Sequence, residues 1–169
     1  MQFAVALVLA LVLGVGVNAM GDIKPPHWGQ CDASWSNDTV GNCNFTICES
    51  DGTLVSLSMY MAARGYGGNA GTLNAWLRDN GGYDKDCNII WENFSGFGIV
   101  TFQGIEKLNY DTACSGLDAG HGLLGNLKAK KRCVLLTSCT GYGMYRVEDP
   151  VDHTDSYNET EIKDFVVFH

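Results

Sequence analysis

The chain has 169 residues, 46% of them hydrophobic and 18% charged, which is enough for one domain with a substantial core. Its formal net charge of −8 at pH 7 disfavours nucleic acids and anionic membrane surfaces as partners, because both carry negative charge themselves. The charge alone does not identify a partner.

The N-terminal segment has the pattern of a secretory signal. Residues 3–17 form an apolar run, and small residues close it at Val17-Asn18-Ala19. The run is too short to span a bilayer comfortably. We therefore predict a signal peptide at residues 1–19, a secreted, extracellular mature chain, and no membrane span after the signal is removed.

All seven cysteines lie after residue 19, and none has the Cys-x-x-Cys spacing of a zinc or redox site. A secreted context favours disulfides, although the sequence alone cannot fix their pairing. Cys133 begins the most apolar strand, so we expect it to keep its thiol, and Cys48 to pair with Cys43 or Cys31. The candidates for disulfides are Cys31, Cys43, Cys48, Cys87, Cys114 and Cys139.

Four Asn-x-Ser/Thr sequons point to the same compartment and predict N-linked glycans on the surface. They begin at Asn37, Asn44, Asn93 and Asn158. The carboxylates near Asp84 do not have the spacing of a calcium loop, so we expect no metal and no cofactor.

Residues 20–51 are polar and contain Trp28 and Trp35, whose large side chains need somewhere to pack. We interpret this segment as an ordered N-terminal arm, tied by disulfides, of a single domain whose remainder is residues 52–169. A buried helix is predicted from Thr53, apolar on most sides and stopped at Gly65. A second, shorter helix is predicted to be capped by Thr72 and to end before residues 81–82.

The second half of the chain has β-rich runs. Residues 87–102 are typical of short strands, or of a strand and a loop, and residues 123–130 allow a helix. Strands are predicted at 133–137, 144–147 and 165–168, with a turn at 140–143. Helices followed by an antiparallel sheet indicate an α+β domain, with the N-terminal helix packed on the sheet.

Several fragments of the chain occur in a recognisable order: Gln30-Cys-Asp-Ala-Ser-Trp35, Thr46-Ile47, Gly52-x-x-Val55-x-Leu57-x-Met59, Thr72-Leu-Asn-Ala-Trp-Leu-x-x-Asn-Gly-Gly-Tyr83, Val134-Leu-Leu-Thr137, Tyr145-x-Val147-x-Asp149-Pro150 and Tyr157. Together they resemble the bacteriocin-leader-peptidase-like branch of the papain superfamily of cysteine peptidases. The resemblance covers most of residues 30–168 and leaves 97–125 unmatched.

The resemblance implies a papain-like fold with a catalytic Cys, His and Asp or Asn, and a glutamine that completes the oxyanion hole. The matching glutamine is Gln30 and the matching acid is Asp149. Thr53 stands where the family has its nucleophilic cysteine, and Arg132 stands where it has its histidine. An internal threonine without a base is a negligible nucleophile, and an arginine cannot take a proton.

These substitutions predict a vestigial cleft in which Thr53 lies close to Arg132, while Gln30 and Asp149 face the same gap. We expect Thr53 to cap its helix, Arg132 to pair with Asp149, and Gln30 to bond to the backbone.

Three functions follow. The first is a secreted pseudo-peptidase that acts by binding an unknown protein or by extracellular assembly with itself. The second is an active peptidase with a relocated site, for which Cys48 with His121 is the fallback pair. The third is a structural subunit of an extracellular coat or filament.

Overall fold

The computed structural model describes residues 24–31, 34–50 and 52–169, so the predicted signal peptide lies outside the described residues. The described part is an α+β structure with an antiparallel sheet of six strands. Its helices are α1 (Thr53–Ala63), α2 (Ala70–Asp79), α3 (Tyr110–Asp118) and the 3₁₀ helices η1 (Trp91–Phe97) and η2 (Glu159–Glu161); its strands are β1 (Phe102–Glu106), β2 (Gly122–Leu127), β3 (Cys133–Gly141), β4 (Met144–Glu148), β5 (Ser156–Asn158) and β6 (Ile162–Phe168).

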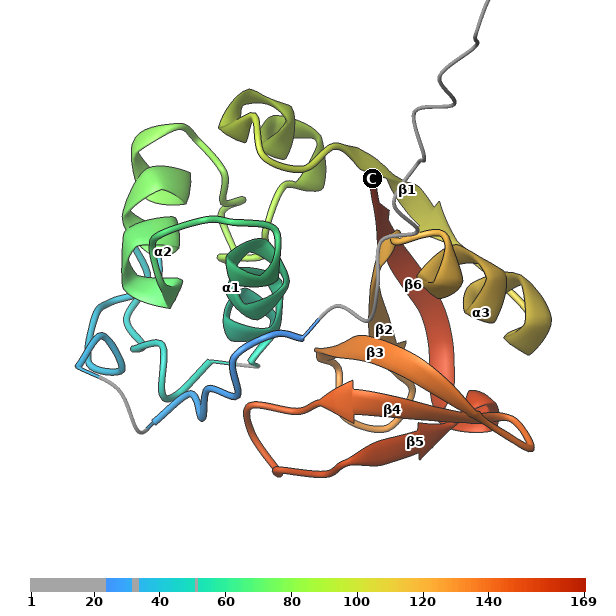
Figure 1. Cartoon of the computed structure of the whole chain (residues 1–169). Helices are drawn as coiled ribbons and strands as arrows, with labels where there is room; N and C mark the ends of the chain where they lie inside the picture. Colours follow the sequence, from blue (N-terminus) through green and yellow to red (C-terminus); the bar gives the residue numbers. More distant parts are fainter. Residues whose placement is uncertain (1–23, 32–33, 51) are drawn as a thin grey trace, which may run out of the picture.

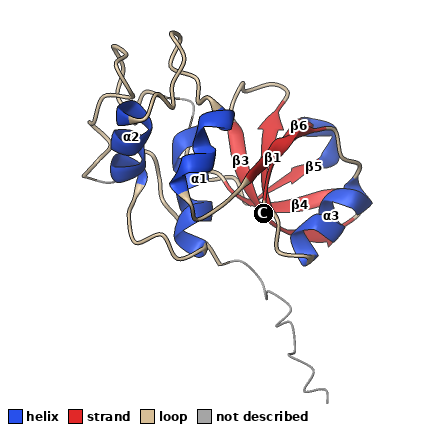
Figure 2. Ribbon diagram, turned by 90° about the horizontal axis from the view of Figure 1, so that it is seen from above, coloured by secondary structure: helices blue, strands red, loops and turns tan. Residues whose placement is uncertain are grey.

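The strands lie in the order β1-β6-β2-β3-β4-β5, and each neighbouring pair is antiparallel. Helix α1 packs against β3 and β2, and α3 contacts the same two strands. Figure 2 shows the sheet between these helices, with α2 on the outer side of α1. In Figure 1 the helical half and the sheet lie side by side, and the chain passes from one to the other between η1 and β1.

Alternation along the strands builds a core on each face of the sheet. On the α1 face, the buried strand residues are Leu124, Cys133, Leu135, Val166 and Phe168. On the α3 face, they include Leu123, Val134, Leu136, Phe165 and Val167. The central strands are therefore apolar on both sides, which explains their continuous hydrophobic runs.

Helix α1 confirms the predicted buried helix. Every residue from Leu54 to Met61 is buried, because the sheet lies on one side of α1 and α2 and the arm lie on others. Gly52 precedes the helix with φ 78°, a conformation that favours glycine. The expectation that Thr53 caps α1 is wrong: Gly52 is the N-cap and Thr53 is the first helical residue.

Three other local predictions are wrong in instructive ways. Asn69, not Thr72, is the N-cap of α2; Thr72 completes a capping box with it. Residues 123–130 do not form a helix, because residues 122–127 are strand β2 in the centre of the sheet. Strand β2 is buried on both faces, so its sequence lacks the alternation of apolar and polar residues that marks a strand. Residues 91–97 form η1, whose aromatic residues recur every third position, as a 3₁₀ helix requires for a common face.

Helix α3 lies between β1 and β2 in the chain and was not predicted, so the helices do not all precede the sheet. Asn109 caps it by accepting a hydrogen bond from the Thr112 N–H at 2.9 Å. Ala113 and Leu117 are the residues it buries against the sheet. This amphipathic face covers the side of the sheet opposite α1.

Three disulfides tie the described part together: Cys31–Cys48, Cys43–Cys87 and Cys114–Cys139. Cys133 is buried and keeps its thiol, as predicted. The arm is ordered around its tryptophans, whose rings meet edge to face with centroids 6.3 Å apart. These bonds fit a secreted, disulfide-bonded protein. Among the residues described, no helix is long and apolar enough to cross a membrane.

Candidate functional site

A cleft of about 430 Å³ opens between the start of α1, the start of β3 and the loop that leads into η1. Lys131, Arg132 and Asn126 line it from the sheet side, and Thr53 and Leu54 from α1. The other lining residues come from the arm and from the loop before η1; they are Val40, Phe45, Glu49, Ser50, Tyr83, Asp86, Cys87, Asn88, Ile89, Trp91 and, at the start of β3, Cys133. Apolar, cationic and anionic groups therefore share one opening.

Of the four residues predicted to share a cleft, Gln30 and Asp149 are not among its lining residues, whereas Thr53 and Arg132 both line it. Gln30 lies beside them, because its backbone N–H donates to the Pro150 carbonyl at 2.9 Å. Asp149 precedes that proline and contacts Arg132. Four segments far apart in the sequence thus converge at the N-terminal end of α1.

Arg132 and Asp149 form a buried ion pair, as predicted. The guanidinium donates to Asp149 Oδ2 at 2.8 Å, and its side chain is 8% exposed against 0% for Asp149. A second carboxylate, Asp152, lies 2.7 Å from the same guanidinium nitrogen. Burial alone would lower the pKa of Arg132, but the bonds to Asp152 and Asp149 outweigh it and raise that pKa.

Asp149 is held from both sides of its carboxylate. Its Oδ2 also accepts from the Tyr157 hydroxyl at 2.7 Å, and its Oδ1 accepts from the backbone N–H groups of Val151 and Asp152. Burial would raise the pKa of Asp149, but the bonds from Tyr157, Val151 and Arg132 together hold it below its usual value. The pair is therefore charged, and the Arg132 guanidinium cannot accept a proton.

Gln30 bonds to the backbone, as predicted. Its side-chain nitrogen donates to the Cys48 carbonyl at 2.6 Å and to the Ser50 carbonyl at 3.1 Å. Its side-chain oxygen has no hydrogen-bond partner among the described atoms and lies toward Gly52. Both N–H groups thus fix the segment before α1 and are not directed at a ligand in the cleft.

The Thr53 hydroxyl binds the neighbouring strand. Its Oγ1 accepts from the Cys133 backbone N–H at 3.1 Å. One turn along α1, the Ser56 hydroxyl donates to the Cys133 carbonyl at 3.0 Å. Helix α1 therefore binds both backbone groups of the first residue of β3, which fixes the floor of the cleft.

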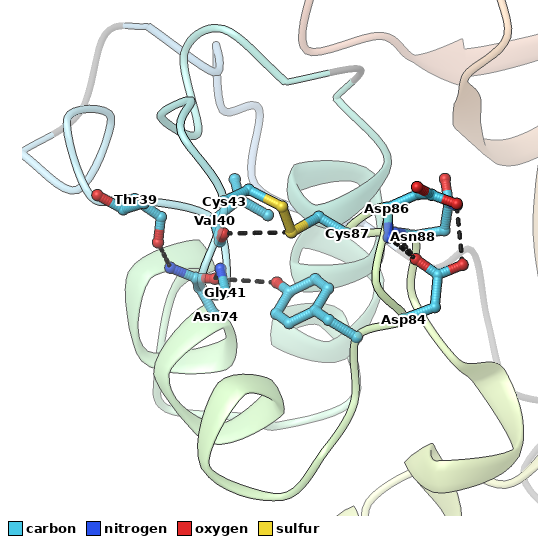
Figure 3. Close-up of a disulfide and its surroundings, with 10 residues drawn as sticks. Thr39, Val40, Gly41, Cys43, Asn74, Asp84, Asp86, Cys87 and Asn88 are labelled. Atoms are coloured by element: carbon cyan, nitrogen blue, oxygen red, sulfur yellow. Dashed lines mark hydrogen bonds between the residues drawn. A yellow bond between two sulfur atoms is a disulfide. The ribbon is translucent and has the colours of Figure 1, made fainter.

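The opposite wall is held by the Cys43–Cys87 disulfide and by the buried Asn74 of α2 (Figure 3). The Asn74 amide nitrogen donates to the Thr39 carbonyl at 2.8 Å, and its oxygen accepts from the Gly41 N–H at 3.0 Å. The arm is thus attached to α2 by side-chain hydrogen bonds and to the loop before η1 by a covalent bond. These connections make the wall part of the folded domain.

The same figure shows how the loop before η1 is folded around Asp84. The Asp84 carboxylate accepts from the backbone N–H groups of Asp86 and Asn88 and from the Asn88 side chain. These bonds, with the Asn88 side chain first, lower the pKa of Asp84. The Asp84 carboxylate therefore stabilises the fold of its own loop through these hydrogen bonds.

The fallback pair, Cys48 with His121, does not come together. Cys48 is bonded to Cys31, so it has no thiol to act as a nucleophile. His121 lies beyond the opposite end of α1, where it faces His169 and Arg64. The eleven residues of α1 separate the two ends by roughly 16 Å. The prediction of this relocated pair is wrong.

Sequence reasoning missed Asp152, Tyr157 and Lys130. Lys130 contacts Asp152 and donates to the Tyr157 hydroxyl. Two bonds, from Lys130 and then Arg132, lower the pKa of Asp152 to about 2. Opposite charges in the sequence could have indicated these contacts, because residues 130–132 are three cations and residues 149 and 152 are carboxylates.

Of the four sequon asparagines, Asn37, Asn44 and Asn93 are exposed, and Asn158 is half-buried. The Asn158 side chain caps η2, where its oxygen accepts from the Thr160 N–H at 3.0 Å. The Asn37 and Asn44 side chains are thus exposed, whereas the Asn93 side-chain nitrogen donates to the Gly81 carbonyl at 2.8 Å and the Asn158 side chain caps η2.

Among the described residues, no group of three or more His, Cys, Asp or Glu side chains is arranged to hold a metal ion. Comparison with known proteins finds no family model, no curated protein and no solved structure that matches the chain.

Proposed function

We propose that this chain is a secreted glycoprotein of papain-like architecture that lacks catalysis and binds an extended peptide segment of a partner protein in the cleft. One observation carries the proposal: a cleft opens beside Thr53, while Arg132, at the position that the resemblance assigns to the base, is held in a buried ion pair with Asp149.

The chemistry of the residues supports the loss of catalysis. Acyl transfer needs a nucleophile, a base and donors for an oxyanion. The Thr53 hydroxyl accepts from the Cys133 N–H, Arg132 cannot accept a proton, and the Gln30 amide donates to two carbonyls. Each of the three roles is thereby unfilled at the positions that the resemblance assigns to it.

The lining of the cleft supports binding. Its volume of about 430 Å³ lies within the range of small-ligand and peptide sites. Ile89 and Trp91 offer apolar surface, while Lys131 and Glu49 offer charges of both signs at the edge. A peptide segment combines these needs, because it presents apolar side chains and backbone polar groups together.

Secretion and glycosylation are supported by separate features. The disulfides require an oxidising compartment to form, and three of the four sequon asparagines are exposed. We infer glycans at Asn37, Asn44 and Asn93.

Peptide selection on the secreted protein tests the proposal. A display library of twelve-residue random peptides is selected on the wild type, and the enriched peptides are measured against variants on both sides of the cleft. Lys131→Glu and Ile89→Asp are expected to weaken binding at least tenfold. Lys107→Glu and Ile105→Asp are matched controls at exposed positions outside the cleft, and they should bind as the wild type does.

The same peptides are then incubated with the protein and weighed by mass spectrometry. Intact peptides support a binding function, whereas cleaved peptides would reinstate the peptidase. Binding that survives both cleft variants would place the interaction elsewhere.

Extracellular assembly is the second form of the proposal, and the edge strand β1 favours it, because Ile105 is 55% exposed there. Unpaired strand edges with apolar side chains promote pairing between chains. Light scattering of the purified protein, with and without reductant, separates a monomer from an assembly. An assembly that Ile105→Asp dissociates would make the partner a second copy of the chain.

A further inference from the structure

The cleft has an excess of positive charge on its sheet side, although the whole chain has a net charge of −8. Lys130 contacts Asp152, and Arg132 contacts both Asp149 and Asp152. Among the described residues, no carboxylate pairs with Lys131, which is exposed and lines the cleft. Three neighbouring cations therefore share two carboxylates, and the cation left over is the one at the opening.

Each of the two carboxylates in the lining is held by a residue close to it in the chain. Glu49 accepts from the backbone N–H and from the hydroxyl of Thr46, at 2.9 and 3.1 Å. The Asp86 carboxylate lies 2.7 Å from the ammonium group of Lys85. Neither of them forms an ion pair with Lys131, so the charge of that lysine is available to a group that enters the cleft.

Arg132 also has hydrogen-bonding capacity left over. Its Nη2 makes both carboxylate contacts, at 2.8 Å to Asp149 and 2.7 Å to Asp152. Its Nε is buried and has no hydrogen-bond partner among the described atoms, in a side chain that is 8% exposed and lines the cleft. A guanidinium has five N–H groups, so it can bind a further anion through the donors that its ion pairs leave unused.

Helix α1 begins at the same place. The Thr53 hydroxyl accepts from the Cys133 N–H, which holds the start of α1 beside the start of β3. The N-cap Gly52 has no side chain to bond the first N–H groups, and the first turn contains no acidic residue. The first intrahelical bond runs from the Ser56 N–H to the Gly52 carbonyl at 3.0 Å, so the N–H of Leu54 lies outside the helical ladder. The positive end of the helix dipole therefore favours an anion here.

We propose that this corner of the cleft, formed by Lys131, Arg132 and the N-terminal end of α1, binds a carboxylate of the peptide. The inference rests on the proposed function, because it names the chemical group that the bound peptide presents at this corner. Leu54 and Ile89 line the same cleft, so an apolar side chain fits next to the carboxylate. A C-terminal carboxylate and the side chain of an aspartate or glutamate both meet this requirement. Binding is ionic, and no covalent bond forms or breaks.

NMR titration of the full secreted protein with three tripeptides tests the corner. Acetyl-Ala-Ile-Leu with a free C-terminal carboxylate is compared with its C-terminal amide, and acetyl-Ala-Asp-Leu-amide carries a carboxylate on its side chain instead. At least one of the two carboxylate peptides should shift the signals of the Arg132 Nε–H and the Leu54 N–H. The amide of the first peptide should bind about tenfold more weakly than that carboxylate peptide, because a hydrogen bond to a charged group is lost.

A matched pair of variants tests the unpaired lysine. Lys131→Gln should weaken binding of the carboxylate peptide by up to about fivefold, the usual range for an exposed ion pair. The same variant should reduce the loss of binding that added salt causes in the wild type, because salt screens exposed charges. Lys107→Gln, at an exposed position outside the lining, should bind as the wild type does.

The outcomes separate this inference from the proposed function. No shift of the Arg132 signal with either carboxylate peptide, or equal binding of acid and amide peptides, would overturn the carboxylate site. Selected peptides that bind in the cleft equally well after amidation and after replacement of their acidic residues would leave the peptide function standing without this site. A carboxylate-dependent shift at Arg132, with no selected peptide bound in the cleft, would support the site and remove the peptide function.

Discussion

Thr53 and Cys133 are joined by a hydrogen bond of 3.1 Å from the Cys133 backbone N–H to the Thr53 hydroxyl, across 80 residues of sequence. It connects the first residue of α1 to the first residue of β3. The position that resembles a nucleophile is thus a structural contact between the helical half and the sheet. Its hydroxyl holds the first residue of β3 against α1 at the floor of the cleft.

Replacing this hydroxyl should cost little stability. In Thr53→Val, the buried N–H of Cys133 loses its acceptor, and we expect a loss of about 1–2 kcal/mol in the free energy of unfolding. Thr53→Ser keeps the acceptor and should lose less. Urea denaturation of both variants measures the difference, and equal losses would mean that the hydroxyl contributes nothing.

Arg132→Ala should destabilise the domain more strongly. It leaves the Asp149 carboxylate buried without its cation, and breaking such a pair costs about 3–5 kcal/mol. Arg132→Lys keeps a positive charge but places it on a shorter and more strongly hydrated side chain, so we expect an intermediate loss. A larger loss at Thr53 than at Arg132, in the same denaturation assay, would show that the pair is not the principal support of the cleft.

Introducing the cysteine and histidine that the resemblance would assign to Thr53 and Arg132 should not create a peptidase. Thr53→Cys with Arg132→His supplies a thiol and an imidazole, but the Gln30 amide still donates to the Cys48 and Ser50 carbonyls and supplies no oxyanion donor. We expect hydrolysis of fluorogenic peptides within tenfold of the wild-type background, in a variant that circular dichroism shows to be folded. A thousandfold increase would contradict this account.

The Cys43–Cys87 disulfide should matter to both stability and binding. It closes a loop of 44 residues, so replacing both cysteines with serine is expected to cost about 4 kcal/mol. The Cys114–Cys139 disulfide closes a loop of 25 residues, and neither of its cysteines lines the cleft. Replacing both of these cysteines with serine should cost about 3.5 kcal/mol on the same scale. Loss of binding to the selected peptides is expected for the first pair and not for the second, which separates the cleft wall from general stability.

His121 should make the fold sensitive to mild acid. Burial first, and then His169 and Arg64, lower its pKa below 6.5. The unfolded state therefore takes up a proton more readily than the folded state. The stability from neutral His121 is complete above about pH 6.5 and is lost as the pH falls through the lower folded pKa. Denaturation midpoints at pH 7.5 and 5.0 should differ less in His121→Asn than in the wild type; an unchanged difference would exclude this contribution.

The sequence predicted those helices and strands whose hydrophobic pattern does not depend on contacts with distant segments. The apolar run after Gly52 is buried on nearly all sides in any packing, so α1 could be predicted. The strands at β3, β4 and β6 were predicted because β-branched and aromatic residues follow turn residues there. The helix at 123–130 was wrong because Leu123 and Leu124 face opposite cores, which removes the alternation that marks a strand.

The candidate site was predicted in part because charge and the resemblance both pointed to it. Arg132 and Asp149 were expected to pair, and they do. Asp152 and Tyr157 were missed, since their contacts with the pair depend on how the turn after Asp149 folds back. The meeting of His27 with His153 was missed for the same reason, because 126 residues separate them.

The buried helix, the strand-rich C-terminal half and the disulfide chemistry could be predicted from the sequence, because residue type sets propensity and redox behaviour. The partner of each cysteine, the use of the Thr53 hydroxyl by Cys133 and the groups that face the cleft are seen only in the folded chain. These depend on contacts between distant segments. Such contacts form when α1 and α3 pack on the sheet, and no local sequence pattern predicts them.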